Sequence, residues 1–173
     1  MSIQKSRIFT VLRYVLPILL TLLWLSFIYG NSLKTGEQSS EQSGKVHEVV
    51  NEVAQSVGIE KPISEHTVRT SAHFFEFAVL GGLICLDLWA FRIVSLKKKL
   101  HTSVLLSLTS LPICSLLASI DELLQKTSKG RGPSATDVLI DTAGSATAIL
   151  LFILAFSLLR SAVKKRQKQS VNL

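Results

Sequence analysis

Four long apolar segments, separated by polar stretches, run through the chain at about residues 8–29, 72–94, 103–124 and 138–159. Each is close to the roughly 20 residues that an α-helix needs to cross the hydrocarbon core of a membrane. The pattern therefore predicts an all-α protein built as a four-helix transmembrane bundle. Because the number of spans is even, we expect both termini to lie on the same side of the membrane.

The composition agrees with a membrane protein. The 173 residues are 47% hydrophobic and have a mean hydropathy of +0.40, which together indicate one small integral membrane domain spanning residues 1–173. The first apolar segment is longer than the roughly 7–15 residues of a signal-peptide core. No Ala-x-Ala cleavage site follows closely after Tyr29, so we expect this segment to be a retained anchor.

Basic residues predict which side is cytoplasmic, because short loops rich in Lys and Arg stay in the cytoplasm. Twelve of them flank the same ends of the spans: Lys5, Arg7, Arg13, Arg92, Lys97, Lys98, Lys99, Arg160, Lys164, Lys165, Arg166 and Lys168. We therefore predict that both termini are cytoplasmic and that residues 160–173 form a basic tail. These flanks account for the formal net charge of +7, so membrane lipids and no nucleic acid are the expected partners.

The outer segment, residues 31–69, begins polar and then becomes periodic. Its apolar residues at helical spacing are Val46, Val49, Val50, Val53, Ala54 and Val57. This spacing predicts an extracytoplasmic amphipathic helix between the first and second spans, either lying on the membrane surface or capping the bundle. Gly58 can end that helix, and Ser64 can cap a new one that runs through Arg69 into the second span.

Three polar clusters lie at the outer ends of the apolar segments: His73 to Glu76, Asp121 to Gln125, and Arg131 to Asp141. Ionisable groups so close to hydrocarbon usually serve a function. Residues three or four positions apart on a helix point in nearly the same direction, which pairs His73 with Glu76, Asp121 with Gln125, and Asp137 with Asp141. We expect either Asp121 or Glu122 to face the bundle. Small residues, Gly144, Ser145 and Ala148, continue the last stripe and permit close helix packing.

Two interpretations of these clusters remain open. In a structural network, Arg69, Arg131 and His73 would neutralise part of the acidic charge. Five acids outnumber these three residues: Glu76, Asp121, Glu122, Asp137 and Asp141. This surplus implies raised carboxyl pKa values, a bound cation or a cationic ligand group, and it favours a binding site over a scaffold.

The remaining features within the spans have simpler interpretations. Cys85 and Cys114 are expected to be buried as small apolar residues, because no CxxC or neighbouring His accompanies them. Asp87 is expected to pair with Arg92 near the cytoplasmic edge.

The motifs HFFEF, DELLQ and GRGPSATDVLIDTAG resemble, in order and spacing, those of the VanZ-like membrane proteins of bacteria. The resemblance covers about residues 69–148. The positions that match the family pattern are Arg69, His73, Glu76, Asp121, Glu122, Gln125, Arg131, Asp137, Asp141 and Gly144. The positions that depart from it are Thr70, Phe77, Leu124 and Lys129. The namesake of the family is associated with low-level resistance to the glycopeptide teicoplanin, so the resemblance implies a cell-envelope role.

We predict a non-transporting protein of the bacterial cell membrane whose outer-face site binds a polar group of a lipid, a lipid-linked cell-wall precursor or a lipophilic glycopeptide. Arg69 and Arg131 would hold an anionic group, because charge-assisted hydrogen bonds are the stronger ones. The other expected ligand-binding residues are His73, Glu76, Asp121, Glu122, Gln125, Asp137 and Asp141.

Two alternatives remain. An intramembrane enzyme would act on a lipid-linked substrate, with general acid and base drawn from His73, Glu76, Asp121, Glu122 and Asp141. No cofactor is expected, although a divalent cation held by Glu76, Asp121 or Glu122, and Asp141 would suit such oxygen ligands. A small transporter is the third interpretation, but four spans leave little room for inverted repeats unless the protein forms oligomers, and the sequence predicts no oligomeric state.

Overall fold

The chain folds into helices alone across the part described by the computed structural model, residues 3–59, 61–132 and 134–171. The helices are α1 (Ile3–Ser32), α2 (Gly36–Ser56), α3 (Glu65–Ala90), α4 (Leu100–Leu108), α5 (Ser110–Thr127) and α6 (Ala135–Val171). Four segments are long and apolar enough to cross a membrane: Val11–Ser32, Glu65–Ala90, Leu100–Thr127 and Ala135–Gln167. The predicted all-α class is thus confirmed, as are four helical segments long and apolar enough to be the predicted spans.

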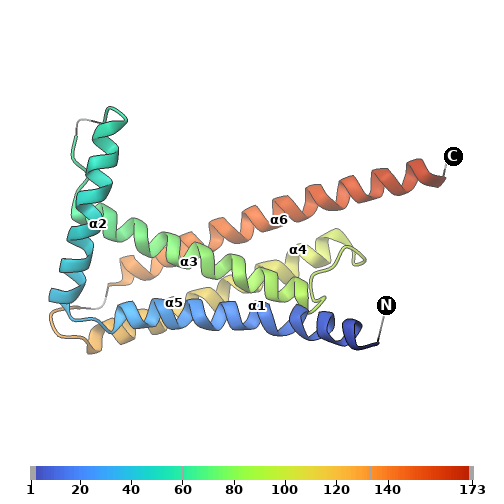
Figure 1. Cartoon of the computed structure of the whole chain (residues 1–173), viewed down its shortest axis with the longest axis horizontal. Helices are drawn as coiled ribbons and strands as arrows, with labels where there is room; N and C mark the ends of the chain where they lie inside the picture. Colours follow the sequence, from blue (N-terminus) through green and yellow to red (C-terminus); the bar gives the residue numbers. More distant parts are fainter. Residues whose placement is uncertain (1–2, 60, 133, 172–173) are drawn as a thin grey trace.

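The spans lie beside one another, and both ends of the chain lie at the same end of the bundle (Figure 1). At the opposite end, where α1 finishes and α3 and α6 begin, helix α2 runs across the spans. We call this opposite end the polar end. Helix α3 packs mainly against α6, and also against α1, α2 and α5. It is therefore the central helix of the bundle.

The third span is not one continuous helix, because α4 and α5 meet at Thr109. Pro112 explains the break, since proline lacks an N–H and its ring clashes with the carbonyl four residues earlier, here that of Leu108. The second span also ends earlier than predicted, at Ala90 rather than residue 94. Arg92 follows it with a φ of 59°, a left-handed conformation that terminates the helix.

The core is small and central. Its buried apolar residues are Ile28, Phe77, Leu80, Ile84, Cys114 and Ala118. Both cysteines are fully buried, as expected. Large apolar side chains such as Leu23, Leu116 and Leu151 are about 60% exposed, because the outer faces of the spans contact lipid rather than protein.

Small residues bring α3 and α6 into close contact. A Cβ on Gly144 would lie 2.1 Å from the carbonyl oxygen of Phe74, and one on Gly81 would lie 2.9 Å from that of Ser145. The Ser145 hydroxyl donates a hydrogen bond of 3.0 Å to the carbonyl oxygen of Phe77. The predicted small-residue stripe therefore permits close packing between these helices.

Helix α2 is held at both ends. At its start, Thr35 and Gln38 form a capping box, and the N–H of Gly36 donates to the carbonyl oxygen of Lys129 in the α5–α6 loop. Near its other end, Asn51 accepts from the N–H of Ile63 at 2.8 Å and donates to its carbonyl oxygen at 3.2 Å. The segment leading into α3 is therefore fixed to α2.

One expectation about a side-chain contact needs correction, and the structure adds the conformation of the basic tail. Asp87 accepts a hydrogen bond from Thr21 at 2.8 Å, and no ion pair with Arg92 forms among the residues described. The basic tail predicted after residue 159 is helical and continues α6 to Val171. A helix can continue there because no glycine or proline interrupts residues 160–171.

Candidate functional site

A cavity at the polar end is partly open to solvent and has a volume of about 100 Å³. Its walls come from α1, α2, α3 and the α5–α6 loop, and its ionisable lining residues are Arg69, His73, Glu76 and Arg131. This volume is smaller than the roughly 300–1,000 Å³ typical of sites for drug-sized molecules. The cavity therefore suits a phosphate or another small polar group of a larger ligand, and it has no room for an acyl chain.

Arg69 and Arg131 place two guanidinium groups along this cavity. Arg131 donates only long hydrogen bonds, of 3.4 and 3.5 Å, to the carbonyl oxygens of Asn31 and Ser32, and its buried Nε atom has no partner. Among the residues that the structure describes, neither arginine forms an ion pair with a carboxylate. Any neutralisation of the acids by these arginines therefore acts at a distance there, without a direct arginine–carboxylate contact.

The electrostatic environment of Arg131 follows from its position. Burial lowers the pKa of its guanidinium from the ordinary value, and the positive charge of Arg69 adds to this shift. The carboxylates of Asp121, Glu122 and Asp137 oppose it. An anionic group in the cavity would relieve the repulsion between the two arginines.

Glu76 is oriented by the end of α1. Its Oε1 atom accepts a hydrogen bond of 3.1 Å from the side-chain amide of Asn31. The carbonyl oxygen of Glu76 accepts a second bond, of 2.9 Å, from the indole of Trp24. Asn31 in turn accepts from Lys34 at 2.9 Å. Glu76 thus reaches the cavity as part of a hydrogen-bonded chain between α1 and α3.

Both acids of the DELLQ motif are buried, whereas the sequence led us to expect one. Asp121 is fully buried and accepts hydrogen bonds from Ser32 at 2.5 Å and from Gln125 at 2.9 Å. Glu122 accepts a bond from the backbone N–H of Ser134 and so holds the α5–α6 loop. Asp121 and Glu122 make different contacts because successive residues on a helix point in different directions. Asp121 contacts α1, and Glu122 contacts the α5–α6 loop.

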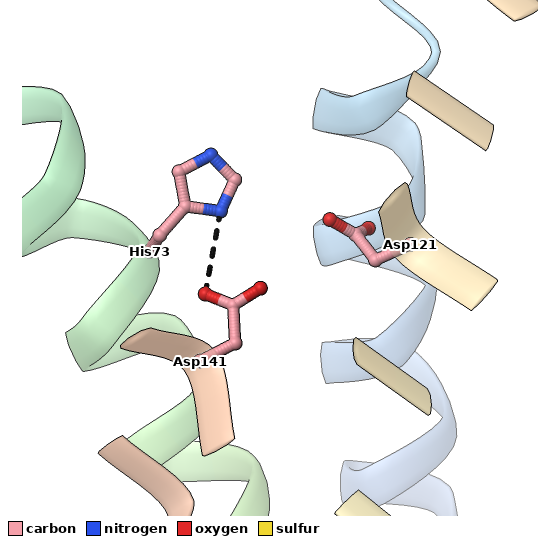
Figure 2. Close-up of side chains that lie close together, drawn as sticks. All are labelled: His73, Asp121 and Asp141. Carbon is pink, nitrogen blue, oxygen red and sulfur yellow. Dashed lines mark ion pairs between the residues drawn. The ribbon is translucent and has the colours of Figure 1, made fainter. Parts of the chain in front are cut away.

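His73, Asp121 and Asp141 come together from α3, α5 and α6, and Figure 2 shows their side chains gathered. One ligand atom from each lies within 4.8 Å of the other two. The Nδ1 atom of His73 lies 3.6 Å from Oδ1 of Asp141. The oxygen-only metal set predicted from the sequence included Glu76 and Glu122, but this group contains His73 and neither glutamate.

Asp137 lies one turn before Asp141, in the first turn of α6, and is half-buried. It lines a second, smaller cavity, which also contacts Arg69 and His73. The nine predicted ligand-binding residues therefore lie at the polar end, and six of them form two sets. Arg69, Arg131 and Glu76 line the main cavity, and Asp121 and Asp141 lie beside it with His73 joining the two.

Sequence reasoning missed the contribution of α1. Asn31 and Ser32 form its last turn and bond to Glu76 and Asp121. The available signal was that both polar residues directly follow an apolar segment that runs to Tyr29. The hydroxyl of Ser134 accepts a bond from the N–H of Asp137 just before α6, as a helix cap does. Nothing in the sequence indicates that the N–H of Ser134 bonds to Glu122.

These features define a multi-pass helical membrane protein with a polar site at one end of its bundle. The sequence model of the VanZ/LLP1 family matches residues 17–157, so the chain belongs to this family of membrane proteins. No curated protein and no solved structure matches the chain.

Proposed function

We propose that this protein binds the anionic group of a membrane lipid or of a lipid-linked cell-wall precursor in the cavity at its polar end. The observation that carries the proposal is the pair of guanidinium groups, Arg69 and Arg131, that line one cavity without a carboxylate partner among the described residues. Guanidinium groups bind phosphate through paired hydrogen bonds, and a buried arginine without a counter-ion is costly.

The position of the cavity fits a ligand anchored in the bilayer. It lies where the spans end, at the depth of lipid headgroups. The distribution of basic residues supports cytoplasmic termini, which would turn the polar end toward the outside of the cell. A lipid in the outer leaflet would then reach the cavity with its headgroup while its acyl chains stay in hydrocarbon.

Helix α2 is proposed to lie in the headgroup layer beside the cavity. It crosses the ends of the spans (Figure 1), and Val49, Val53 and Val57 expose 58–69% of their surface. An exposed apolar stripe on a helix of this orientation is typical of contact with acyl chains. Spin labels at Val53→Cys and Gln55→Cys in vesicles test this. The first should be more accessible to oxygen, and equal accessibility would contradict the proposal.

Ligand binding can be tested by thermal unfolding of the detergent-purified protein. The variants are Arg69→Gln and Arg131→Gln, and the matched control is Lys129→Gln, which removes an exposed charge at the same end. The additives are phosphatidylglycerol, a lipid-linked wall precursor and, as the comparison with a zwitterionic headgroup of zero net charge, phosphatidylcholine. A ligand present at about 100 times its Kd stabilises the native state by about 2.7 kcal/mol.

We expect the anionic additives to stabilise the wild type and Lys129→Gln, and to act much less on the two arginine variants. Phosphatidylcholine should have little effect on any of them. Stabilisation of all proteins to the same extent by every lipid would refute the proposal, because it would reflect general bilayer contact. The two ligand sources are distinguished by comparing how much phosphatidylglycerol and the wall precursor each raise the unfolding temperature of the wild type.

The namesake of the family is associated with teicoplanin resistance, which raises the question of whether teicoplanin binds in the same cavity. Teicoplanin added to the same unfolding experiment would stabilise the wild type if it binds the cavity directly. A protein that binds lipid but ignores teicoplanin could still alter resistance in cells through the lipid. A null effect of the gene on teicoplanin sensitivity, with lipid binding intact, would remove resistance from the proposal.

An enzyme acting on the same lipid-linked ligand is the second candidate. The observation that favours it is the imidazole of His73, which lines the cavity and has the carboxylate of Asp141 3.6 Å behind it. A carboxylate can orient an imidazole for general acid–base catalysis. Turnover of a lipid-phosphate or lipid-sugar pool by the wild type, lost in His73→Gln, would support this function. Absence of turnover of both pools would contradict it.

A further inference from the structure

The buried group beside the cavity contains two carboxylates, and no Lys or Arg of the described residues forms an ion pair with either of them. Asp121 and Asp141 expose 0% and 1% of their surface, respectively. Asp121 accepts from two neutral donors, Ser32 and Gln125. Two carboxylates in a site that excludes water repel each other unless a cation or a proton compensates their charge.

Asp141 also has an oxygen atom that no donor reaches. Its Oδ1 atom is buried and without a hydrogen-bond partner in the described part of the chain, and the same is true of Nδ1 of His73. These atoms face each other at 3.6 Å, which is too long for a hydrogen bond. Buried polar atoms without a partner are rare in native proteins, and where they occur they often contact a bound ion or water.

The same separation suits two ligands of a single metal ion. Metal–ligand bonds of about 2.0–2.2 Å place neighbouring ligand atoms of a tetrahedral site roughly 3.3–3.6 Å apart. The His73–Asp141 separation already meets this spacing. The remaining separations, at most 4.8 Å, would close by about 1 Å through side-chain rotation of Asp121 and His73.

We propose that His73, Asp121 and Asp141 bind one divalent transition-metal ion, with Zn²⁺ and Mn²⁺ as the best matches. Two carboxylates and a neutral imidazole balance the charge of such an ion. Imidazole nitrogen suits transition metals, whereas Ca²⁺ and Mg²⁺ prefer oxygen ligands alone. Ser32 and Gln125 orient Asp121, as hydrogen-bond donors commonly orient a metal-binding carboxylate.

Three protein ligands leave at least one coordination position for water or for a ligand atom. His73 lines the main cavity as well as belonging to the group, so an anionic group held by the two arginines would lie next to the ion. This last connection rests on the proposed function. The metal site itself does not depend on it.

Metal binding can be measured directly on the purified full-length protein. The protein is stripped with a chelator, reloaded with Zn²⁺, Mn²⁺, Mg²⁺ or Ca²⁺, and analysed for bound metal by mass spectrometry and for affinity by calorimetry. The test variants are His73→Gln and Asp141→Asn. The matched control is Glu65→Gln, which removes an exposed carboxylate in the first turn of α3, at a residue outside the group.

We expect one equivalent of Zn²⁺ or Mn²⁺ in the wild type and in Glu65→Gln, and at least a 100-fold loss of affinity in the two test variants. Absence of metal binding by the stripped wild type would overturn the proposal whether or not any variant folds. Binding of Ca²⁺ and Mg²⁺ as tight as that of Zn²⁺ would also overturn it, because His73 would then not be a ligand.

The lipid experiment separates this inference from the proposed function. Metal binding without added lipid, retained in Arg131→Gln, supports the ion site whatever the lipid result. Lipid binding by a wild type that takes up no metal overturns the ion site alone. Weaker anionic-lipid binding after metal removal, with the loss reversed by Zn²⁺, supports the contact between the ion and the ligand, and unchanged lipid binding contradicts that contact.

Discussion

Gly144 on α6 lies against the carbonyl oxygen of Phe74 on α3, so closely that a Cβ atom at residue 144 would come within 2.1 Å of it. Phe74 directly follows His73, and Gly144 lies three residues after Asp141. The contact therefore sets the separation of the two helices at the point where His73 and Asp141 face each other. The geometry of the group formed by His73, Asp121 and Asp141 therefore depends on Gly144, a residue with no side chain.

Replacing Gly144 with alanine should destabilise the protein and separate α3 from α6. Overpacking of a close contact typically costs about 1–3 kcal/mol. The matched control is Gly82→Ala on α3, where a Cβ would meet nothing within 4 Å and alanine improves helix propensity. Thermal unfolding in detergent measures both. Equal stability of the two variants would contradict the close contact.

Ser32→Ala should weaken the link between α1 and α5. The Ser32 hydroxyl donates at 2.5 Å to Asp121, and its loss leaves a fully buried carboxylate oxygen without that donor, at a cost of about 1–3 kcal/mol. Ser26→Ala is the control, because that exposed hydroxyl bonds only to the carbonyl oxygen of Leu22 in its own helix. Unfolding curves that shift equally for both variants would mean that the Asp121 contact contributes nothing.

Asn51→Ala should loosen the segment between α2 and α3. Asn51 holds both backbone groups of Ile63, and His47 lies 2.8 Å from the same carbonyl oxygen. Without Asn51, the N–H of Ile63 loses its acceptor, and amide exchange should accelerate about tenfold or more at Ile63. Hydrogen exchange measured by mass spectrometry tests this. Gln55→Ala on the exposed face should leave it unchanged, and similar rates in both would contradict the prediction.

The fold was predictable from the sequence where local rules decide it. A polypeptide in lipid must satisfy its backbone hydrogen bonds internally, so four apolar segments of sufficient length had to be helices. Helical geometry also fixed the Asp121–Gln125 bond in advance. The break before Ser110 is equally local, since Pro112 causes it, but hydropathy alone gives no sign of it because both halves are apolar.

The candidate site was predictable only in part, because its contacts join separate helices. The motifs placed the acids at one end, yet they did not show that His73 rather than Glu76 meets Asp121 and Asp141. That choice depends on how α3 is rotated against α6, which Gly144 and Gly81 fix by backbone contact. The bonds from Asn31 and Ser32 were hidden for the same reason, since they connect residues more than 40 positions apart.

The membrane orientation gives a prediction that needs no ligand. Single cysteines at Glu37, in the first turn of α2, and at Lys165, in the last part of α6, occupy exposed positions at opposite ends of the bundle. A membrane-impermeant maleimide applied to intact cells should label Glu37→Cys, and should label Lys165→Cys only after permeabilisation, because the basic flanks favour cytoplasmic termini. The wild type is a low-background control, since Cys85 and Cys114 are fully buried. The reverse labelling pattern would place the arginine-lined cavity in the cytoplasm and would restrict its ligands to molecules of the inner leaflet.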